Sequence, residues 1–234
     1  RNSFPMGTGI ASSASAFAAL TVAAAAALGL DLDEATLSAL ARRGSGSAAR
    51  SVPDGFVRWH AAASDAASYA ESLHPASFWP LHDVVAIVSR QHKAVGSGGG
   101  HALAPSSPLF APRIARLPRR LAAVCAAIDA RDLAALGPEI EAEALELHAT
   151  AMTSQPPVLY WDGATVELLH AVRRWRADGL GVWFTLDAGP NVHLICDAHV
   201  AAQVRDAAAS LDFVEDALDN VAADGARVVS RSEA

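Results

Sequence analysis

Two apolar runs separated by a short corner limit the folds that this chain of 234 residues can adopt. Residues 181–187 (GVWFTLD) and 191–197 (NVHLICD) have the β-branched and aromatic content of strands, and Ala188-Gly189-Pro190 lies between them. A connection this short joins two strands only in antiparallel order. The sequence therefore predicts an α+β fold with a mixed or antiparallel sheet, in preference to a doubly wound α/β sheet.

Apolar spacing and stop signals predict the other elements. Residues 11–30 are dominated by alanine, a strong helix former with little apolar surface, and predict a core helix buried on most sides instead of a membrane span. Residues 63–80 are irregular and contain two prolines, so we place a domain boundary between residues 78 and 79. We expect further helices at 32–43, 112–129, 131–151, 164–178 and 199–211, strands at 55–62, 82–90 and 225–231, and a glycine loop at 93–103.

The composition argues against several classes of protein. The chain is 52% hydrophobic and 18% charged, as expected of a folded domain, and its net charge of −7 is not the basic footprint of a nucleic-acid-binding protein. Cys125 and Cys196 each stand alone in apolar stretches, which indicates buried thiols in a reducing, cytosolic protein. The nine histidines lack metal-ligand spacing, and we expect His148 and His170 to be structural residues on helices. The acidic run 139–146 is interpreted as a solvated helix face.

A glycine-rich turn leads into the alanine-rich helix at residues 4–17 (FPMGTGIASSASAF). Gly7 and Gly9 leave room for a phosphate to approach the unpaired N–H groups at a helix N-terminus. The hydroxyls of Ser12 and Ser13 could add hydrogen bonds or reach Mg²⁺. An ordinary capped junction between a loop and a helix would use the same residues, and no lysine follows the glycines as it does in a Walker loop.

A second small-residue stretch, ARRGSGSAARS at 41–51, ends in an arginine. If Ser47 opens a helical turn, Arg50 lies three residues further along on the same face, behind Ser45 and Gly46. A guanidinium group can hold a carboxylate or phosphate with two parallel hydrogen bonds. The alternative is a Gly/Ser linker beside a solvated arginine.

The third stretch, KAVGSGGGHAL at 93–103, places Ser97 between glycines. Backbone amides of such a loop could surround a phosphate, although a mobile hairpin tip would have the same composition. The corner after Asp187 is open to two interpretations as well. It is either a turn made of common turn residues or a carboxylate held at a strand end and directed into a reaction site. Taken together, these groups suggest phosphoryl transfer.

The same segments carry a resemblance to a known family. The first resembles the phosphate-binding segment of the GHMP small-molecule kinases, and the whole set is similar, in order, to mevalonate diphosphate decarboxylases. The similarity runs from about residue 2 to about residue 195. It rests on FPMGTGIASSASAFAAL, RRGSGSAARS, KAVGSGGGH, ELHATAMTSQPPVLYW and FTLDAGPN.

This resemblance implies a reaction and a role for each motif. ATP would phosphorylate the tertiary 3-hydroxyl of a 5-phosphorylated mevalonate, and loss of that phosphate with CO₂ would give an isopentenyl product. Asp187 would be the catalytic carboxylate beside the 3-hydroxyl, and Arg50 would hold the carboxylate of the substrate. The implied substrate contacts are Ser45, Gly46, Ser47 and Ser97, and the implied contacts to ATP and Mg²⁺ are Gly7, Thr8, Gly9, Ser12 and Ser13.

The resemblance also implies a two-domain GHMP-kinase-like fold, with an incomplete N-terminal domain at 1–78 and a ferredoxin-like C-terminal domain at 79–234. The implied protein is a cytoplasmic homodimer whose partner is phosphorylated mevalonate, with no nucleic acid or membrane involved. The family has an N-terminal segment with a substrate-facing lysine and much of the adenine pocket, and we expect the chain to be truncated there.

Departures from the family pattern leave alternatives open. His101 stands where the family usually has methionine, and Pro53-Asp54 also breaks the pattern. The substrate could be mevalonate 5-phosphate instead of the 5-diphosphate, or the protein could be a kinase that phosphorylates the 3-hydroxyl and stops. The presence of both Asp187 and Arg50 favours decarboxylation. A different class of protein, a non-catalytic binding domain that retains the scaffold, is the remaining alternative.

Overall fold

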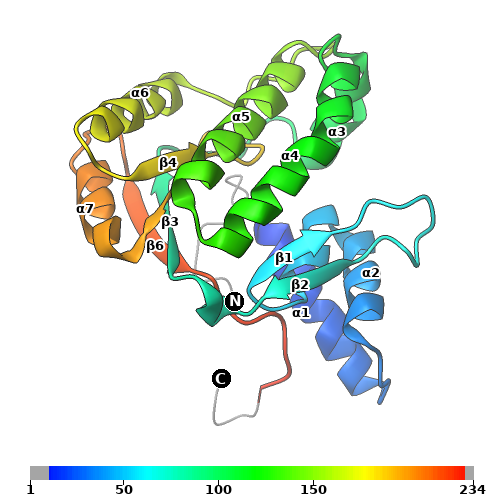
Figure 1. The fold of residues 1–234 in the computed structure, drawn as a ribbon. Helices are drawn as coiled ribbons and strands as arrows, with labels where there is room; N and C mark the ends of the chain where they lie inside the picture. Colours follow the sequence, from blue (N-terminus) through cyan, green and yellow to red (C-terminus); the bar gives the residue numbers. More distant parts are fainter. Residues whose placement is uncertain (1–10, 230–234) are drawn as a thin grey trace. The chain divides into compact units, whose positions relative to one another are not determined.

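The computed structural model describes residues 11–229, which form two compact units with separate cores (Figure 1). The first unit contains residues 11–80 and 221–229, and the second contains residues 81–220. The main chain passes from one unit to the other after Pro80 and returns after Asn220.

In the first unit, two helices and a 3-10 helix pack through small side chains. Helix α1 (Ser12–Ala27) and helix α2 (Glu34–Gly44) both contact the 3-10 helix η1 (Gly46–Ser51). The shared core is Ala18, Ala41, Ala48 and Val52. Alanine at these positions lets the three backbones approach one another closely, which fixes the position of η1.

Helix α1 confirms the predicted helix but is not buried on most sides. Only Ala14 and Ala18 are buried, and Leu20 is 61% exposed, because the described residues pack against one stripe of the helix. Among residues 11–229, no helix combines the length and the apolar character needed to cross a membrane.

A β-hairpin completes the first unit. Strand β1 (Phe56–Trp59) pairs in antiparallel order with β2 (Ala70–His74), which lies in a region predicted to be irregular. The buried hydroxyl of Ser38 connects this hairpin to η1, since it donates to the carbonyl of Ala49 and accepts from the amide of Ala70. One serine of α2 therefore aligns both neighbouring elements.

The second unit is built on a four-stranded sheet in the order β4-β5-β3-β6. Strands β4 (Val182–Thr185) and β5 (Val192–Asp197) form the predicted antiparallel pair, and β5 also pairs in antiparallel order with β3 (Leu81–Ile87). Strand β6 (Asp216–Val221) lies beside β3. The α+β prediction with mixed or antiparallel pairing is confirmed.

Two other local predictions, one in each unit, were wrong. The described part of the expected strand at 225–231 is irregular, because the amide of Gly225 donates to Asp54 and the amide of Ala226 to the carbonyl of Ser51. Most of the expected glycine loop at 93–103 is helix α3 (Ser97–Leu103), followed by the 3-10 helix η3 (Ala104–Ser106).

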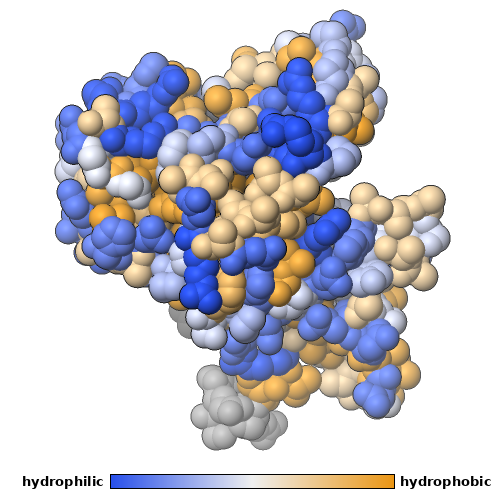
Figure 2. Space-filling view, in the orientation of Figure 1, coloured by the Kyte–Doolittle hydropathy of each residue, from blue (hydrophilic) through white to orange (hydrophobic). Residues whose placement is uncertain are grey.

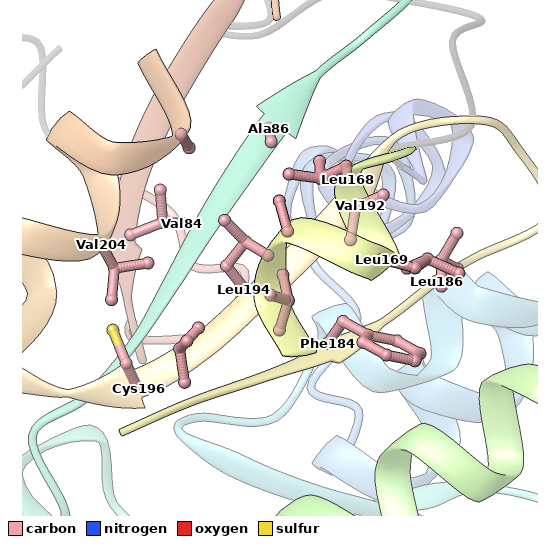
Figure 3. Packing of buried hydrophobic residues seen from close by; sticks show 14 of the residues in the cluster. Val84, Ala86, Leu168, Leu169, Phe184, Leu186, Val192, Leu194, Cys196 and Val204 are labelled. Atoms are coloured by element: carbon pink, nitrogen blue, oxygen red, sulfur yellow. The ribbon is translucent and has the colours of Figure 1, made fainter. Parts of the chain in front are cut away.

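Helices pack on the sheet and beside its β4 edge. Helices α6 (Gly163–Ala177) and α7 (Ala198–Ala209) meet one face in a core that includes Leu168, Val192, Leu194 and Val204 (Figure 3). Helix α5 (Leu133–Met152) contacts β4 and also packs beside α4 (Phe110–Ala130). The predicted helices at 112–129, 131–151, 164–178 and 199–211 are thereby confirmed.

Charged side chains join α4 to α5, so the predicted solvated face at 139–146 is wrong. Arg120 is 7% exposed at its side chain and bonds Glu139, Glu143 and Glu146. The visible surface over α4 and α5 is mixed, with a hydrophilic patch beside a weakly hydrophobic one (Figure 2). Alternation of charge and alanine along α5 does not distinguish solvated carboxylates from carboxylates that face arginines of a neighbouring helix.

The contact between α5 and β4 predicts a strong size limit at Gly137. A Cβ there would overlap the indole of Trp183, which also stacks on the guanidinium of Arg176, 3.8 Å from the ring centroid. We expect Gly137→Ala to lower the free energy of unfolding by about 1–3 kcal/mol, although alanine favours helix. Urea denaturation would measure this loss. The control is Gly163→Ala, which has open space around the new methyl group; equal stability of the two variants would contradict the prediction.

Candidate active site

Three of the serines predicted to bind ligand lie together in the first unit. The hydroxyl oxygens of Ser13 and Ser45 are 2.9 Å apart, and those of Ser45 and Ser47 are 3.4 Å apart. Ser13 comes from the first turn of α1, and the other two flank the start of η1. The close packing of η1 on α1 therefore builds a short chain of hydroxyl groups that can donate to phosphate oxygens.

Arg50 lies near the end of η1, three residues after Ser47. Its guanidinium is 5.8 Å from the ring centroid of Trp59 on β1, and the residue is exposed. A Cβ at Gly46 would contact the same indole at 3.5 Å. Trp59 thus lies beside both the guanidinium of Arg50 and the backbone of Gly46. The sequence analysis missed it, because one aromatic residue in an alternating strand is no signal of a site.

The start of α1 is only partly described. Gly7, Thr8 and Gly9 lie outside the described residues. Ser12 is half-buried in the first turn of α1, and Ala11 before it has a left-handed backbone with φ 48°. The N-cap position of α1 is Ala11, whose side chain makes no capping hydrogen bond.

In the second unit, three side chains, two from helices and one from the loop before α3, hold the corner that carries Asp187. Nε2 of His148 on α5 donates to the carbonyl of Asp187 at 3.1 Å. Nζ of Lys93 donates to the carbonyl of Ala188 at 2.7 Å, and Oγ1 of Thr165 on α6 donates to the carbonyl of Pro190 at 2.8 Å. The corner is therefore fixed through its backbone.

Asn191 anchors the far side of this corner. Its side-chain oxygen accepts from the amides of Val88 and Ser89 at 2.9 and 3.1 Å, and its side-chain nitrogen donates to the carbonyl of Ser89. The Asp187 side chain stays exposed within the unit. The corner is a tight turn, and it presents an exposed carboxylate from a rigid support. That this carboxylate is directed into a reaction site stays a prediction.

Lys93 is a cation that the sequence analysis missed. Burial lowers the pKa of its ammonium group, while the charge of Asp187 acts in the opposite direction. Its ammonium also lies 5.9 Å from the ring centroid of Tyr160. A lone lysine before a glycine stretch gives no sign that it will bond a turn that lies 95 residues further along the chain.

The predicted structural role applies to one of two histidines. His148 is fully buried between Tyr160 and Trp161, and burial lowers its pKa to about 4, so the imidazole is neutral. A neutral ring that donates from Nε2 has an accepting Nδ1. His170 is exposed, so its assignment as a structural residue was wrong.

A second histidine lies on β5. Nδ1 of His193 is 2.8 Å from a carboxylate oxygen of Asp83 on β3. Burial opposes the charged form, but the charge and hydrogen bond of Asp83, together with the charge of Asp187, raise the pKa of His193 to about 9. His193 is therefore an imidazolium at neutral pH.

These two histidines predict a bell-shaped dependence of stability on pH. Between the unfolded pKa of 6.5 and about 4, the unfolded chain binds a proton that folded His148 refuses, so stability falls on acidification. Between 6.5 and about 9, folded His193 retains a proton that the unfolded chain releases, so stability falls as the pH rises.

Urea midpoints across this pH range would test the pattern. We expect His148→Gln to flatten the acid limb and His193→Gln to flatten the alkaline limb. If each variant kept the slope of the parent on its own limb, the assigned protonation states would be wrong.

Ser97 is the first residue of α3 and is exposed. Its segment joins the Asp187 corner through an apolar cluster in which Val95, Leu103 and Ala188 pack on Tyr160. At Gly100 of α3, a Cβ would overlap the hydroxyl of Tyr160, so glycine is needed there for close approach. The segments that carry Ser97 and Asp187 thus pack on the same apolar cluster around Tyr160. Arg50 belongs to the other unit, and its approach to Asp187 stays a prediction.

Two further expectations concern cysteine and metal. Cys196 is buried as predicted, but Cys125 is half-buried because α4 leaves one side of it accessible. Within residues 11–229, no three histidine, cysteine or acidic side chains are grouped closely enough to hold a metal ion.

Family models match most of the chain. Residues 1–70 match the diphosphomevalonate decarboxylase-like N-terminal domain, and residues 83–229 match the mevalonate 5-diphosphate decarboxylase C-terminal domain. The domain boundary predicted between residues 78 and 79 stays a prediction.

Curated proteins with similar sequences are named diphosphomevalonate decarboxylases. A diphosphomevalonate decarboxylase of Aspergillus fumigatus is 39% identical over 213 residues, which cover 86% of this chain and 52% of the relative. The human diphosphomevalonate decarboxylase is 36% identical over 197 residues, which cover 81% of this chain and 48% of the relative. The chain thus spans about half the length of the curated relatives that it matches.

Solved structures give the same result. Mevalonate diphosphate decarboxylase from Staphylococcus aureus has a TM-score of 0.88 at 34% identity, covering 95% of this chain and 68% of that one. The complex of MDDEF with MVAPP, AMPPCP and magnesium also has a TM-score of 0.88, at 35% identity and the same coverage. The fold is the GHMP-kinase-like fold of these proteins, and the chain belongs to the mevalonate 5-diphosphate decarboxylase family.

Proposed function

We propose that the gene product carrying this chain decarboxylates mevalonate 5-diphosphate to isopentenyl diphosphate in an ATP-dependent reaction. The observation that carries the proposal is the exposed carboxylate of Asp187 on a corner whose backbone is held by His148, Lys93 and Thr165. A reaction that must orient a tertiary hydroxyl needs a carboxylate whose position the protein holds fixed.

The first unit supplies groups suited to the two anionic ends of the substrate. The hydroxyls of Ser45 and Ser47, with the open backbone at Gly46, would bind the 5-diphosphate. Arg50 would hold the C1 carboxylate, which a planar guanidinium can grip with two parallel hydrogen bonds. Trp59 limits the directions that this guanidinium can take.

Asp187 has two tasks in this proposal. Its carboxylate accepts a hydrogen bond from the 3-hydroxyl and thereby points the oxygen at the phosphoryl group to be transferred. ATP supplies that phosphoryl group, which makes the 3-oxygen a leaving group. As the carbon–oxygen bond breaks, the fixed negative charge of Asp187 stabilises positive charge at C3, and the carboxylate held by Arg50 leaves as CO₂.

The remaining predicted residues would serve the phosphates of ATP. Ser12 and Ser13 would donate hydroxyl hydrogen bonds, and we propose backbone contacts from Gly7, Thr8 and Gly9. Ser97 would act on the substrate side, where it would help place the phosphoryl group that is transferred. Magnesium commonly binds through substrate phosphates and waters with few protein ligands. The described residues offer serine hydroxyls at the start of α1 for that mode.

Further parts of the proposal rest on the family alone. We propose two domains, divided near residue 78, and a cytoplasmic homodimer.

Product stoichiometry tests the proposed function. Purified gene product is incubated with ATP, magnesium and either mevalonate 5-diphosphate or mevalonate 5-phosphate, and ADP and CO₂ are measured together. We expect equal amounts of ADP and CO₂, with the diphosphate as the preferred substrate. ADP without CO₂ would identify a kinase, preference for the monophosphate would move the assignment to that substrate, and absence of nucleotide binding by calorimetry would identify a non-catalytic binding domain.

A further inference from the structure

The Asp187 corner depends on one buried side chain that is not expected to touch substrate. His148 is fully buried on α5, and its Nε2 donates to the main-chain carbonyl of Asp187 itself, at 3.1 Å. Lys93 and Thr165 bind the carbonyls of residues 188 and 190 instead. His148 is thus the one of these three side chains that is bonded to the residue carrying the carboxylate.

The surroundings of His148 fix the direction of this hydrogen bond. Its ring lies 4.8 Å from the ring of Trp161 and 5.8 Å, edge to face, from the ring of Tyr160. A carbonyl only accepts, so Nε2 must carry the proton. Nδ1 is buried without a hydrogen-bond partner among the described residues, so the ring has one polar attachment, and that attachment is Asp187.

We propose that His148 is a positioning residue for the reaction, which sets the direction of the Asp187 side chain through the main chain of that residue. This proposal rests on the proposed function of Asp187. A carbonyl held in place fixes the peptide plane after Asp187 and with it the backbone angle ψ at that residue. A small rotation there would displace the carboxylate from the 3-hydroxyl, and misplacement by about 1 Å can cost on the order of 10² in rate.

Three substitutions separate positioning from simple packing. His148→Gln places an amide N–H close to the place of Nε2, His148→Asn has an amide that is too short to reach, and His148→Phe keeps the aromatic contacts without a donor. We expect kcat to fall about tenfold or more in the Asn and Phe variants, with KM for both substrates within about threefold of the parent. The Gln variant should stay within about threefold of the parent kcat. The control is His170→Phe, an exposed site on α6, where no change is expected.

A double-mutant cycle tests whether His148 acts through Asp187. In the Asp187→Asn background, the further change His148→Phe should alter the residual kcat by less than about twofold, because no carboxylate remains to be positioned. A full additional loss in that background would overturn the proposal. So would equal impairment of the Gln and Phe variants, or a kcat near the parent value in His148→Phe.

A spectroscopic readout is independent of turnover. Nitrogen NMR of histidine-labelled protein should show neutral His148 with its proton on Nε2 from pH 8 down to pH 5, in agreement with its pKa of about 4. A protonated ring, or a proton on Nδ1, would overturn the proposed hydrogen bond. If the parent protein shows this signature but does not turn over mevalonate 5-diphosphate, the proposed function fails and the geometry stands.

Discussion

Replacing Asp187 with asparagine should reduce kcat by on the order of 10² or more while the protein stays folded. The amide keeps the size of the side chain but removes its negative charge. It accepts a weaker hydrogen bond from the 3-hydroxyl and offers no charge to stabilise a positive centre at C3. The corner itself should survive, because the hydrogen bonds that hold it run through the main chain of residues 187, 188 and 190 and through Asn191.

The controls for this prediction come from the same unit. Asp178→Asn changes an exposed aspartate at the end of α6 and should leave kcat unchanged. Free energies of unfolding from urea denaturation that lie within about 0.5 kcal/mol of the parent for both variants would show that the loss is catalytic and not structural. Turnover near the parent rate in Asp187→Asn would remove this residue from the mechanism.

Replacing Arg120 with methionine should lower the free energy of unfolding by about 3–5 kcal/mol. Arg120 is almost fully buried and bonds carboxylates of Glu139, Glu143 and Glu146 on the facing helix. Its hydrogen bond to Glu146 leads the interactions that raise the pKa of the guanidinium. Methionine would fill much of the space but would leave three carboxylates close together without this shared cation.

The neighbouring Arg119 provides the matched control. Its side chain is 71% exposed and its contact with Glu139 is long, at 3.5 Å, so Arg119→Met should change the free energy of unfolding by less than about 0.5 kcal/mol. The hydrogen bond from Arg120 keeps the pKa of Glu146 below its usual value. The stabilisation from this pair is therefore present above the unfolded pKa of Glu146 and is lost on acidification. The difference in the free energy of unfolding between Arg120→Met and the parent should narrow as the pH falls toward 4. A small difference in the free energy of unfolding between Arg120→Met and the parent at pH 7 would contradict the structural role of Arg120.

Periodic signals in the sequence predicted much of the fold. The hairpin of β4 and β5 and the four long helices follow from apolar spacing and stop residues, which are local properties. Strand β2 lies between irregular residues and was missed, because its pairing with β1 depends on a partner outside any short window. Helix α3 was missed since three glycines argue against a helix, and its packing on Tyr160 is a tertiary contact.

The candidate site was predictable where it uses motifs and not where it uses single residues. Ser13, Ser45 and Ser47 come together as the small-residue stretches suggested. Lys93 and Trp59 carry no pattern and emerged only from their contacts in the structure. The carboxylates at 139–146 were misinterpreted because their arginine partners lie on another helix, about 20 residues away in the chain.

A crystal structure of the gene product with mevalonate 5-diphosphate, magnesium and a non-hydrolysable ATP analogue would measure the central distance directly. We expect a carboxylate oxygen of Asp187 about 2.5–3.0 Å from the 3-hydroxyl oxygen of the substrate, with Arg50 on the C1 carboxylate of the same molecule. A bound substrate whose 3-hydroxyl is held by other groups, with the Asp187 carboxylate turned into solvent, would contradict the account.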